Sequence, residues 1–155
     1  MYSVLNDADS KLLAFAQALE LAIRDIYATL VDRGTKTGDE LAILKLMHSH
    51  HVAYEQSLNG MLSKKAATSR NDEVFTQTFS ALSDPTKTWP VLLELENTAV
   101  ATHTALVEKI ESPTAASLIA SVVMVEARHA AIISTLVTTN LGQALDNPAT
   151  ALAAP

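Results

Sequence analysis

Apolar residues recur at three- and four-residue spacing along most of the chain, a pattern typical of helices with one buried face. The first such segment covers residues 7–33, and the second covers about residues 38–67. Two further segments, at about residues 88–111 and 113–142, continue the pattern. The sequence therefore predicts four long helices. The apolar faces of the first two consist of Leu12, Phe15, Ala16, Leu19, Ile23, Ile26, Tyr27 and Leu30, and of Leu41, Leu44, Met47, His51, Tyr54, Leu58 and Leu62.

Residues that commonly start or stop helices stand at the ends of these segments. Thr37 and Glu40 have the spacing of a capping box at the start of the second segment. Ser112 and Pro113 form an N-cap and first-turn pair that opens the fourth. A glycine follows the first segment, as is common after a helix end. These signals separate the four helices from one another.

The connection between the second and third segments, residues 68–88, differs from the other two connections. It is polar and carries one short helical pattern, made of Val74, Phe75, Phe79 and Leu82. About twenty residues can travel the length of a bundle of roughly 35–40 Å. The other two loops are short, so the helices that they join should be antiparallel. We therefore predict an all-α four-helix bundle with one long crossover that contains a short extra helix.

The composition fits one helical domain followed by a short tail. The chain has 155 residues, of which 48% are hydrophobic and 18% charged, so it is large enough to bury its own core. Its four glycines are too few for the frequent turns of a β fold. We assign residues 1–142 to the bundle. The alanine-rich residues 143–155 form a tail that is either an arm or disordered.

Charge and cysteine content exclude several classes of function. The net charge is −6, which is unfavourable for binding nucleic acid through a basic surface. The chain has no cysteine, so it has no thiolate metal site, no cysteine nucleophile and no disulfide. An acidic chain is compatible with cation binding, but most acidic proteins bind no metal specifically.

Neither a membrane span nor a secretory signal is visible in the sequence. The longest apolar stretch, residues 118–125, is too short to cross a membrane and is followed by Glu126. The first residues, Met1 to Val4, lack the basic region and apolar run of a signal peptide. We therefore expect a soluble protein, cytoplasmic by default and exported if a signal was removed before Met1.

Polar residues that interrupt the apolar faces are the most informative feature. They lie near the middle of all four predicted helices, and with the crossover topology they fall near one layer of the bundle. A buried carboxylate costs several kcal/mol unless it is paired or binds a metal, so such a layer suits divalent cations. We predict a two-metal site made of Glu20, His48, His51, Glu96, Glu126 and His129.

Helical spacing supports shared ligation within this set. Residues at positions i and i+3 lie on one helix face, so Glu126 and His129 can reach one ion together, as can His48 and His51. A Glu on each of two helices and Glu-x-x-His on the other two is the di-iron or di-manganese carboxylate arrangement. For a single Glu the alternative is an ordinary solvated side chain, and the coincidence of four helices favours the metal site.

Two other residues on these faces have more ordinary interpretations. His103 is expected to be a core histidine or a supporting residue rather than a ligand. Tyr27, one or two turns beyond Glu20, is expected to serve packing rather than redox chemistry. Both stay candidates for a supporting role around the metals.

Three segments of the chain resemble bacterial ferritin-like-domain proteins. The sequence Ala18-Leu19-Glu20-Leu21 is similar to their first helix, and the sequence from Leu95 to Ala101 to their third. The sequence from Val125 to Ala131, which contains Glu126 and His129, is the most specific match. The resemblance covers about residues 8–141. It implies a ferritin-like fold and a di-metal site, usually of iron, that reacts with oxygen.

The second helix departs from the family pattern. Where Glu-x-x-His is expected, the chain has His48 and His51. The site then holds three negative charges instead of four, so a second ion should bind more weakly, and zinc or copper could compete with iron. Glu55, one turn beyond His51, is a possible compensating ligand, although it is poorly placed for the same layer. His103 stands where the family often has a tyrosine and offers another nitrogen.

Three hypotheses follow. The first is a di-iron protein that oxidises Fe(II) or reduces peroxide or O2, as a ferroxidase or other non-haem oxidoreductase. The second is a metal-binding or sequestration protein without turnover that holds zinc, manganese or a single ion. The third is a metal-free structural bundle in which glutamates and histidines pair by protonation. The expected partners are metal ions and O2 or peroxide. The sequence is also compatible with a homodimer.

Overall fold

A computed structural model describes residues 5–155, and within them the chain forms helices and no strands. The predicted all-α fold is confirmed. The residues behind the signal-peptide prediction, Met1 to Val4, lie outside the described part. The helices are α1 (Asp7–Arg33), α2 (Gly38–Leu62), η1 (Ser63–Lys65), α3 (Asp72–Ala81), η2 (Pro85–Lys87), α4 (Thr88–Val107), α5 (Pro113–Val137) and α6 (Leu141–Leu145).

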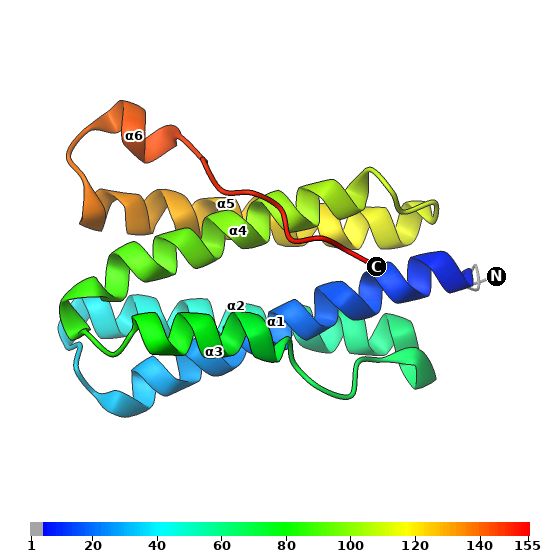
Figure 1. Ribbon diagram of the computed structural model, residues 1–155, viewed down its shortest axis with the longest axis horizontal. Helices are drawn as coiled ribbons and strands as arrows, with labels where there is room; N and C mark the ends of the chain where they lie inside the picture. Colours follow the sequence, from blue (N-terminus) through cyan, green and yellow to red (C-terminus); the bar gives the residue numbers. More distant parts are fainter. Residues whose placement is uncertain (1–4) are drawn as a thin grey trace. The chain divides into compact units, whose positions relative to one another are not determined.

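The helices group into two compact units (Figure 1). The α1–α2 unit is the continuous segment of residues 13–85. The α4–α5 unit combines residues 86–155 with the N-terminal residues up to Leu12. The helix α1 therefore contributes its first turns to one unit and its remainder to the other. That all four long helices share one central layer stays a prediction from the sequence.

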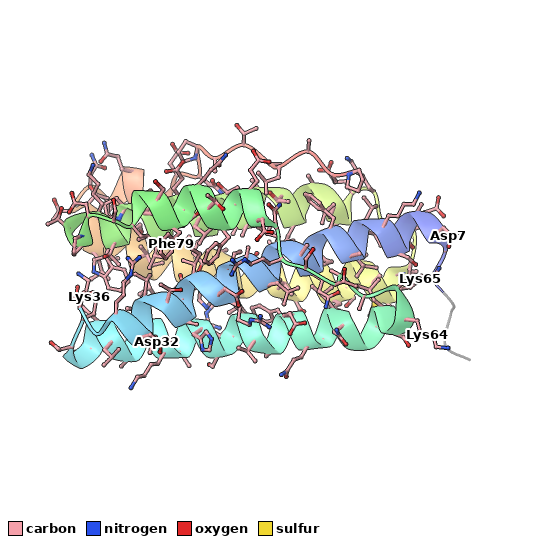
Figure 2. The ribbon with its side chains drawn as sticks, turned by 60° about the horizontal axis from the view of Figure 1, so that its bottom comes forward. Asp7, Asp32, Lys36, Lys64, Lys65 and Phe79 are labelled. Atoms are coloured by element: carbon pink, nitrogen blue, oxygen red, sulfur yellow. The ribbon has the colours of Figure 1, made fainter. Side chains whose placement is uncertain are left out.

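In the α1–α2 unit, α1 and α2 form an antiparallel hairpin (Figure 1). Gly34 ends α1 with φ +63°, a left-handed conformation that glycine adopts without steric cost. The bounds of α1 agree with the predicted 7–33. Figure 2 shows Asp32 and Lys36 at one end of this hairpin and Lys64 and Lys65 at the other.

The second helix ends earlier than predicted, and its start lacks the predicted capping box. At Ser63 the backbone φ is +52°, outside the helical range, so α2 stops at Leu62 instead of near residue 67. Thr37 takes the N-cap position, but its side chain makes no capping hydrogen bond. Gly38, the next residue, has φ +56°, which turns the chain away from the geometry that a capping box needs.

The connection after α2 returns along α1 and contains the expected short helix, α3. The backbone N–H of Asn71 donates to the carbonyl of Ala18, at 2.8 Å. Further on, the Arg33 guanidinium donates to the carbonyl of Leu82, also at 2.8 Å, and lies over the ring of Phe79. This segment therefore follows α1 toward the end where α2 begins. That α2 and α4 run parallel stays a prediction.

In the α4–α5 unit, α4 and α5 form a second antiparallel hairpin. The predicted N-cap is confirmed, since Ser112 Oγ accepts from the backbone N–H of Ala115 and Pro113 opens α5. The two helices end at Val107 and Val137, earlier than predicted. The buried Asp9 carboxylate accepts from the backbone N–H groups of Glu111 and Ser112, at 3.0 and 2.8 Å. These loop amides are satisfied by α1 instead of by a longer α4.

The C-terminal tail is an arm that runs along α4 after the short helix α6 (Figure 1). The Asn147 side-chain amide donates to the carbonyl of Asn97, at 3.2 Å. Further along, the backbone N–H of Leu152 donates to Thr102 Oγ1, at 3.0 Å. Thr102 is 1% exposed, which is unusual for a polar residue on a helix.

Among the described residues, only α5 is long and apolar enough to cross a membrane by length and composition. The core helix of a soluble protein passes the same test. Glu126 and His129 lie on the buried face of α5, as in a core helix that carries a polar site. The compact helical units are of the kind that soluble domains form.

Candidate metal centre

Five of the six predicted ligands are buried, on four helices. Glu20, His51, Glu96 and Glu126 have no exposed surface, and His129 is 4% exposed. All five are histidines or glutamates whose side chains could each offer one ligand atom to a metal ion. These five polar side chains therefore interrupt the buried faces of their helices as predicted, whereas their binding of a metal stays a prediction.

In the α1–α2 unit, Glu20 and His51 form a direct pair. The distance from His51 Nδ1 to Glu20 Oε2 is 2.8 Å. When Glu20 is ionised its carboxylate only accepts hydrogen bonds, and the imidazole Nδ1–H is then the donor. Glu20 lies on the α1 face that also buries Ala16 and Ile23, and His51 follows Met47 on α2. Each helix thus carries one polar side chain on its apolar face, and these two side chains contact each other.

Two tyrosine rings pack against the ring of His51. The rings of Tyr27 and His51 are stacked, with centroids 5.3 Å apart and planes at 19°. The ring of Tyr54 meets His51 edge-on, at 6.0 Å. Tyr27 is fully buried, and its hydroxyl lies 3.5 Å from the sulfur of Met47. Tyr27 therefore packs against a site residue, which agrees with its expected packing role.

His48, the sixth predicted ligand, lies in a different environment. It is only half-buried, whereas His51 is completely buried. Partial burial lowers the pKa of His48 below its ordinary value of 6.5, and the positive charge of Arg24 lowers it further. Although His48 and His51 are three residues apart, His51 alone makes the contact with Glu20.

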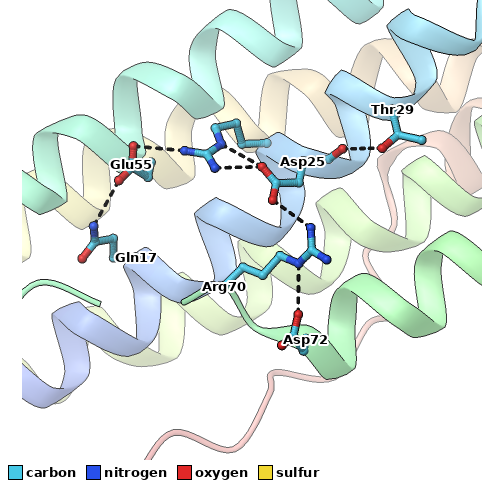
Figure 3. A network of polar contacts seen from close by, with 7 residues as sticks. Gln17, Asp25, Thr29, Glu55, Arg70 and Asp72 are labelled. Atoms are coloured by element: carbon cyan, nitrogen blue, oxygen red, sulfur yellow. Dashed lines mark hydrogen bonds and ion pairs between the residues drawn. The ribbon is translucent and has the colours of Figure 1, made fainter. Parts of the chain in front are cut away.

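Glu55, the possible compensating ligand, is buried but belongs to a separate polar network (Figure 3). One carboxylate oxygen accepts from Gln17 Nε2 at 3.1 Å, and the other lies 3.6 Å from the Arg24 guanidinium. Gln17, which has no exposed surface, was not among the residues predicted from the sequence. Gln17 stands one turn before Glu20 on the same face of α1, but a glutamine in a helix is usually exposed, so its position alone did not select it.

The network continues outward from Arg24 to the connection between α2 and α3 (Figure 3). Arg24 donates two hydrogen bonds to one oxygen of Asp25, at 2.8 and 2.9 Å. The other Asp25 oxygen accepts from Arg70, at 2.9 Å, and Arg70 also donates to Asp72. The guanidinium of Arg70 lies over the ring of Phe75, 3.4 Å from its centroid. Charged contacts thus attach the connection to α1.

The α4–α5 unit buries two Glu–His pairs instead of one. His103 Nδ1 lies 2.9 Å from Glu126 Oε2, and both residues are completely buried. His129 Nδ1 lies 3.3 Å from Glu96 Oε1. Each pair joins α4 to α5, so this hairpin alone buries four glutamate and histidine side chains. His103 contacts Glu126, as expected of a core histidine that supports a site residue.

The donor set fits a divalent metal ion. Carboxylate oxygen and imidazole nitrogen are ligands for iron, zinc and manganese, and the chain offers no thiolate. Glu20, Glu96 and Glu126 each contact one buried histidine, which moderates the cost of burying their charges. The same contacts could orient the glutamates toward a metal, because carboxylate–histidine pairs commonly support metal sites.

A family model for the ferritin-like domain matches residues 8–139. The match covers most of the chain, and the protein therefore belongs to the ferritin-like domain family. The resemblance to the ferritin-like domain is thus confirmed, and its expected range of 8–141 agrees closely with the match. No curated protein and no solved structure matches the chain.

Proposed function

We propose that this protein binds two divalent metal ions, with iron as the first candidate. The proposal is carried by one observation, which is that both helix hairpins bury a carboxylate in direct contact with an imidazole. Membership in the ferritin-like domain family supports it. The ligands that we propose are Glu20, His51, Glu96, Glu126 and His129, and the half-buried His48 is not among them.

The two metal positions should differ in affinity. Glu96, Glu126 and His129 supply three ligand side chains from α4 and α5, and His103 supports Glu126. Glu20 and His51 supply only two from α1 and α2. Three carboxylates leave two divalent ions with one uncompensated positive charge, which weakens the second ion. We therefore expect one tight ion in the α4–α5 unit and one weaker ion in the α1–α2 unit.

With iron as the substrate, the reaction we propose is oxidation of Fe(II). Two Fe(II) ions lose one electron each, and one O2 takes up these two electrons with two protons to form hydrogen peroxide. Where peroxide is the oxidant, it takes up the two electrons with two protons to form two water molecules. The protein's residues would bind the ion and exclude bulk water around it. The buried carboxylates favour the higher charge of Fe(III), which makes the loss of the electron easier.

Metal analysis and oxygen consumption test the proposal. The protein is purified without chelator or affinity metal, and its metal content is measured. Metal-free protein is then titrated with Fe(II) without air, and oxygen uptake is recorded on aeration. Two ions per chain with oxygen uptake are expected. Stoichiometric binding without oxidation would remove the catalytic part of the proposal and leave a metal-binding or sequestration protein.

A metal-free structural bundle is a second candidate, favoured by the direct Glu–His contacts. Three buried carboxylates and their three histidine partners could form a neutral core if the imidazoles carry a proton. In that case the protein would contain no metal, and removing Glu126 would leave a buried imidazole without its charge partner. Metal content of zero in freshly purified protein, with no binding of added Fe(II), would select this candidate.

A further inference from the structure

The pair formed by Gln17 and Glu55 lies next to the pair formed by Glu20 and His51. Gln17 precedes Glu20 by three residues on α1, and Glu55 follows His51 by four on α2. Because α1 and α2 are antiparallel, these pairs are successive contacts between the two helices. Gln17 and Glu55 are both buried, as are Ala16, the residue before Gln17, and Leu58, three residues after Glu55.

Every polar end of this neighbouring pair is occupied. Gln17 Nε2 donates to Glu55 Oε1 at 3.1 Å, and Gln17 Oε1 accepts from the backbone N–H of Ala67 at 2.7 Å. The second oxygen of Glu55 lies 3.6 Å from the Arg24 guanidinium. Both oxygens of Glu55 are therefore engaged by protein groups. This arrangement is typical of a structural carboxylate rather than of a metal ligand.

A buried polar pair can fix how two helices are aligned along their length. Moving one helix by a single turn is a shift of about 5.4 Å, which would separate Gln17 from Glu55 and bury both without partners. A buried polar residue in a coiled coil specifies register in the same way. Purely apolar contacts are less selective between alignments, because apolar packing is non-directional.

We propose that Gln17 and Glu55 are positioning residues that align α1 with α2 so that Glu20 meets His51. Glu55 then affects metal binding indirectly, because it helps to place Glu20 against His51, and it is not itself a ligand. Gln17, through its second contact with Ala67, also ties this alignment to the beginning of the connection that returns along α1. The effect on metal binding rests on the proposed function, whereas the alignment itself does not.

A swap experiment separates positioning from ligation. Gln17→Leu and Glu55→Leu each remove the pair, and the double variant Gln17→Glu/Glu55→Gln restores an amide–carboxylate pair in the opposite order. Gln56→Leu, on the exposed face of α2, is the matched control. All variants are checked for helicity and thermal unfolding, and Co(II) is the metal probe, followed by its visible absorption.

Each Leu variant should weaken Co(II) binding at the weaker position by about tenfold or more, as the loss of a supporting residue commonly does. The swapped variant should recover most of that loss, and Gln56→Leu should match the unchanged protein. If Glu55 were a ligand, Gln17→Leu would leave Co(II) binding intact and the swap would fail to restore it. Either of these results would overturn the proposal.

A second readout needs no metal. In metal-free protein, the hydrogen-bonded Nδ1–H proton of His51 should give a slowly exchanging NMR signal, assigned with His51→Gln. This signal should disappear in both Leu variants and return in the swapped variant. If the unchanged protein binds no Co(II), the proposed function fails, yet this signal still tests the alignment. A signal that persists in both Leu variants would show that Gln17 and Glu55 do not position His51.

Discussion

The two helix hairpins bury the same kind of pair in different surroundings. In α1–α2, the single pair of Glu20 and His51 is flanked by a second polar contact and by two tyrosines. In α4–α5, two Glu–His pairs lie in the interior of one hairpin. Neighbouring contacts therefore support the single pair of the α1–α2 hairpin, whereas the α4–α5 hairpin supplies more potential ligands of its own. This difference leads us to expect unequal metal positions.

The largest effect is expected from removing a ligand in the α4–α5 unit. Glu126→Ala should weaken the tighter ion by more than about 100-fold, beyond the usual effect of losing a supporting residue. Calorimetric titration of metal-free protein with Zn(II) or Co(II) measures the change. Glu94→Ala, on the exposed side of α4, is the control and should bind as the unchanged protein does. Equal losses in both variants would contradict the assignment of Glu126.

Removing the pair in α1–α2 should have a smaller and different effect. Glu20→Ala or His51→Ala should lower the metal content from two ions per chain to one, with the tighter ion retained. The reason is that the α4–α5 hairpin supplies its own ligands. Elemental analysis after dialysis gives the stoichiometry. If both ions were lost together, the two positions would not be independent and the comparison between the hairpins would fail.

The stability of the α4–α5 unit should depend on Asp9, although it lies far away in sequence. Asp9→Ala removes the acceptor of two backbone N–H groups and should lower the free energy of unfolding by about 2–3 kcal/mol. Chemical denaturation measures this loss. The exposed Asp7 in the same turn is the matched control, and Asp7→Ala should cost less than about 1 kcal/mol. Equal effects would mean that the loop contacts of Asp9 contribute little.

The smallest effect is expected at His48. Partial burial and the nearby charge of Arg24 lower its pKa, and His51 adds to this, whereas Asp25 and Asp32 act in the opposite direction. The unfolded chain therefore takes up this proton more readily, so His48 makes stability fall as the pH drops below its ordinary pKa of 6.5. His48→Gln should flatten this dependence slightly, measured by denaturation at pH of about 5 and about 7.5. An unchanged pH dependence would contradict the lowered pKa.

Features with local signals were predictable from the sequence, whereas features made by distant contacts were not. The bounds of α1 and the cap at Ser112 follow from nearby residues. The early end of α2 does not, because serine rarely adopts the positive φ of Ser63. The tail contacts of Asn147 and Leu152 join residues fifty positions apart, and the hydrophobic periodicity of the sequence does not predict them.

The candidate site shows the same division. The glutamates and histidines could be selected because they interrupt apolar faces, and five of the six are buried. Helical spacing alone could not separate His48 from His51, since positions three apart share one side of a helix. Gln17 was overlooked because a glutamine in a helix is usually exposed, and only its partner on α2 reveals that it is buried.

The contacts of Asp9 have a consequence for how the chain is assembled during synthesis. Residues 13–85 are continuous, so this unit can close while later residues are still being added at the ribosome. The two hydrogen bonds of Asp9 can form only after Glu111 and Ser112 have been synthesised, and these residues follow it by more than one hundred positions. The first turn of α1 therefore leaves the ribosome long before the residues that complete its contacts.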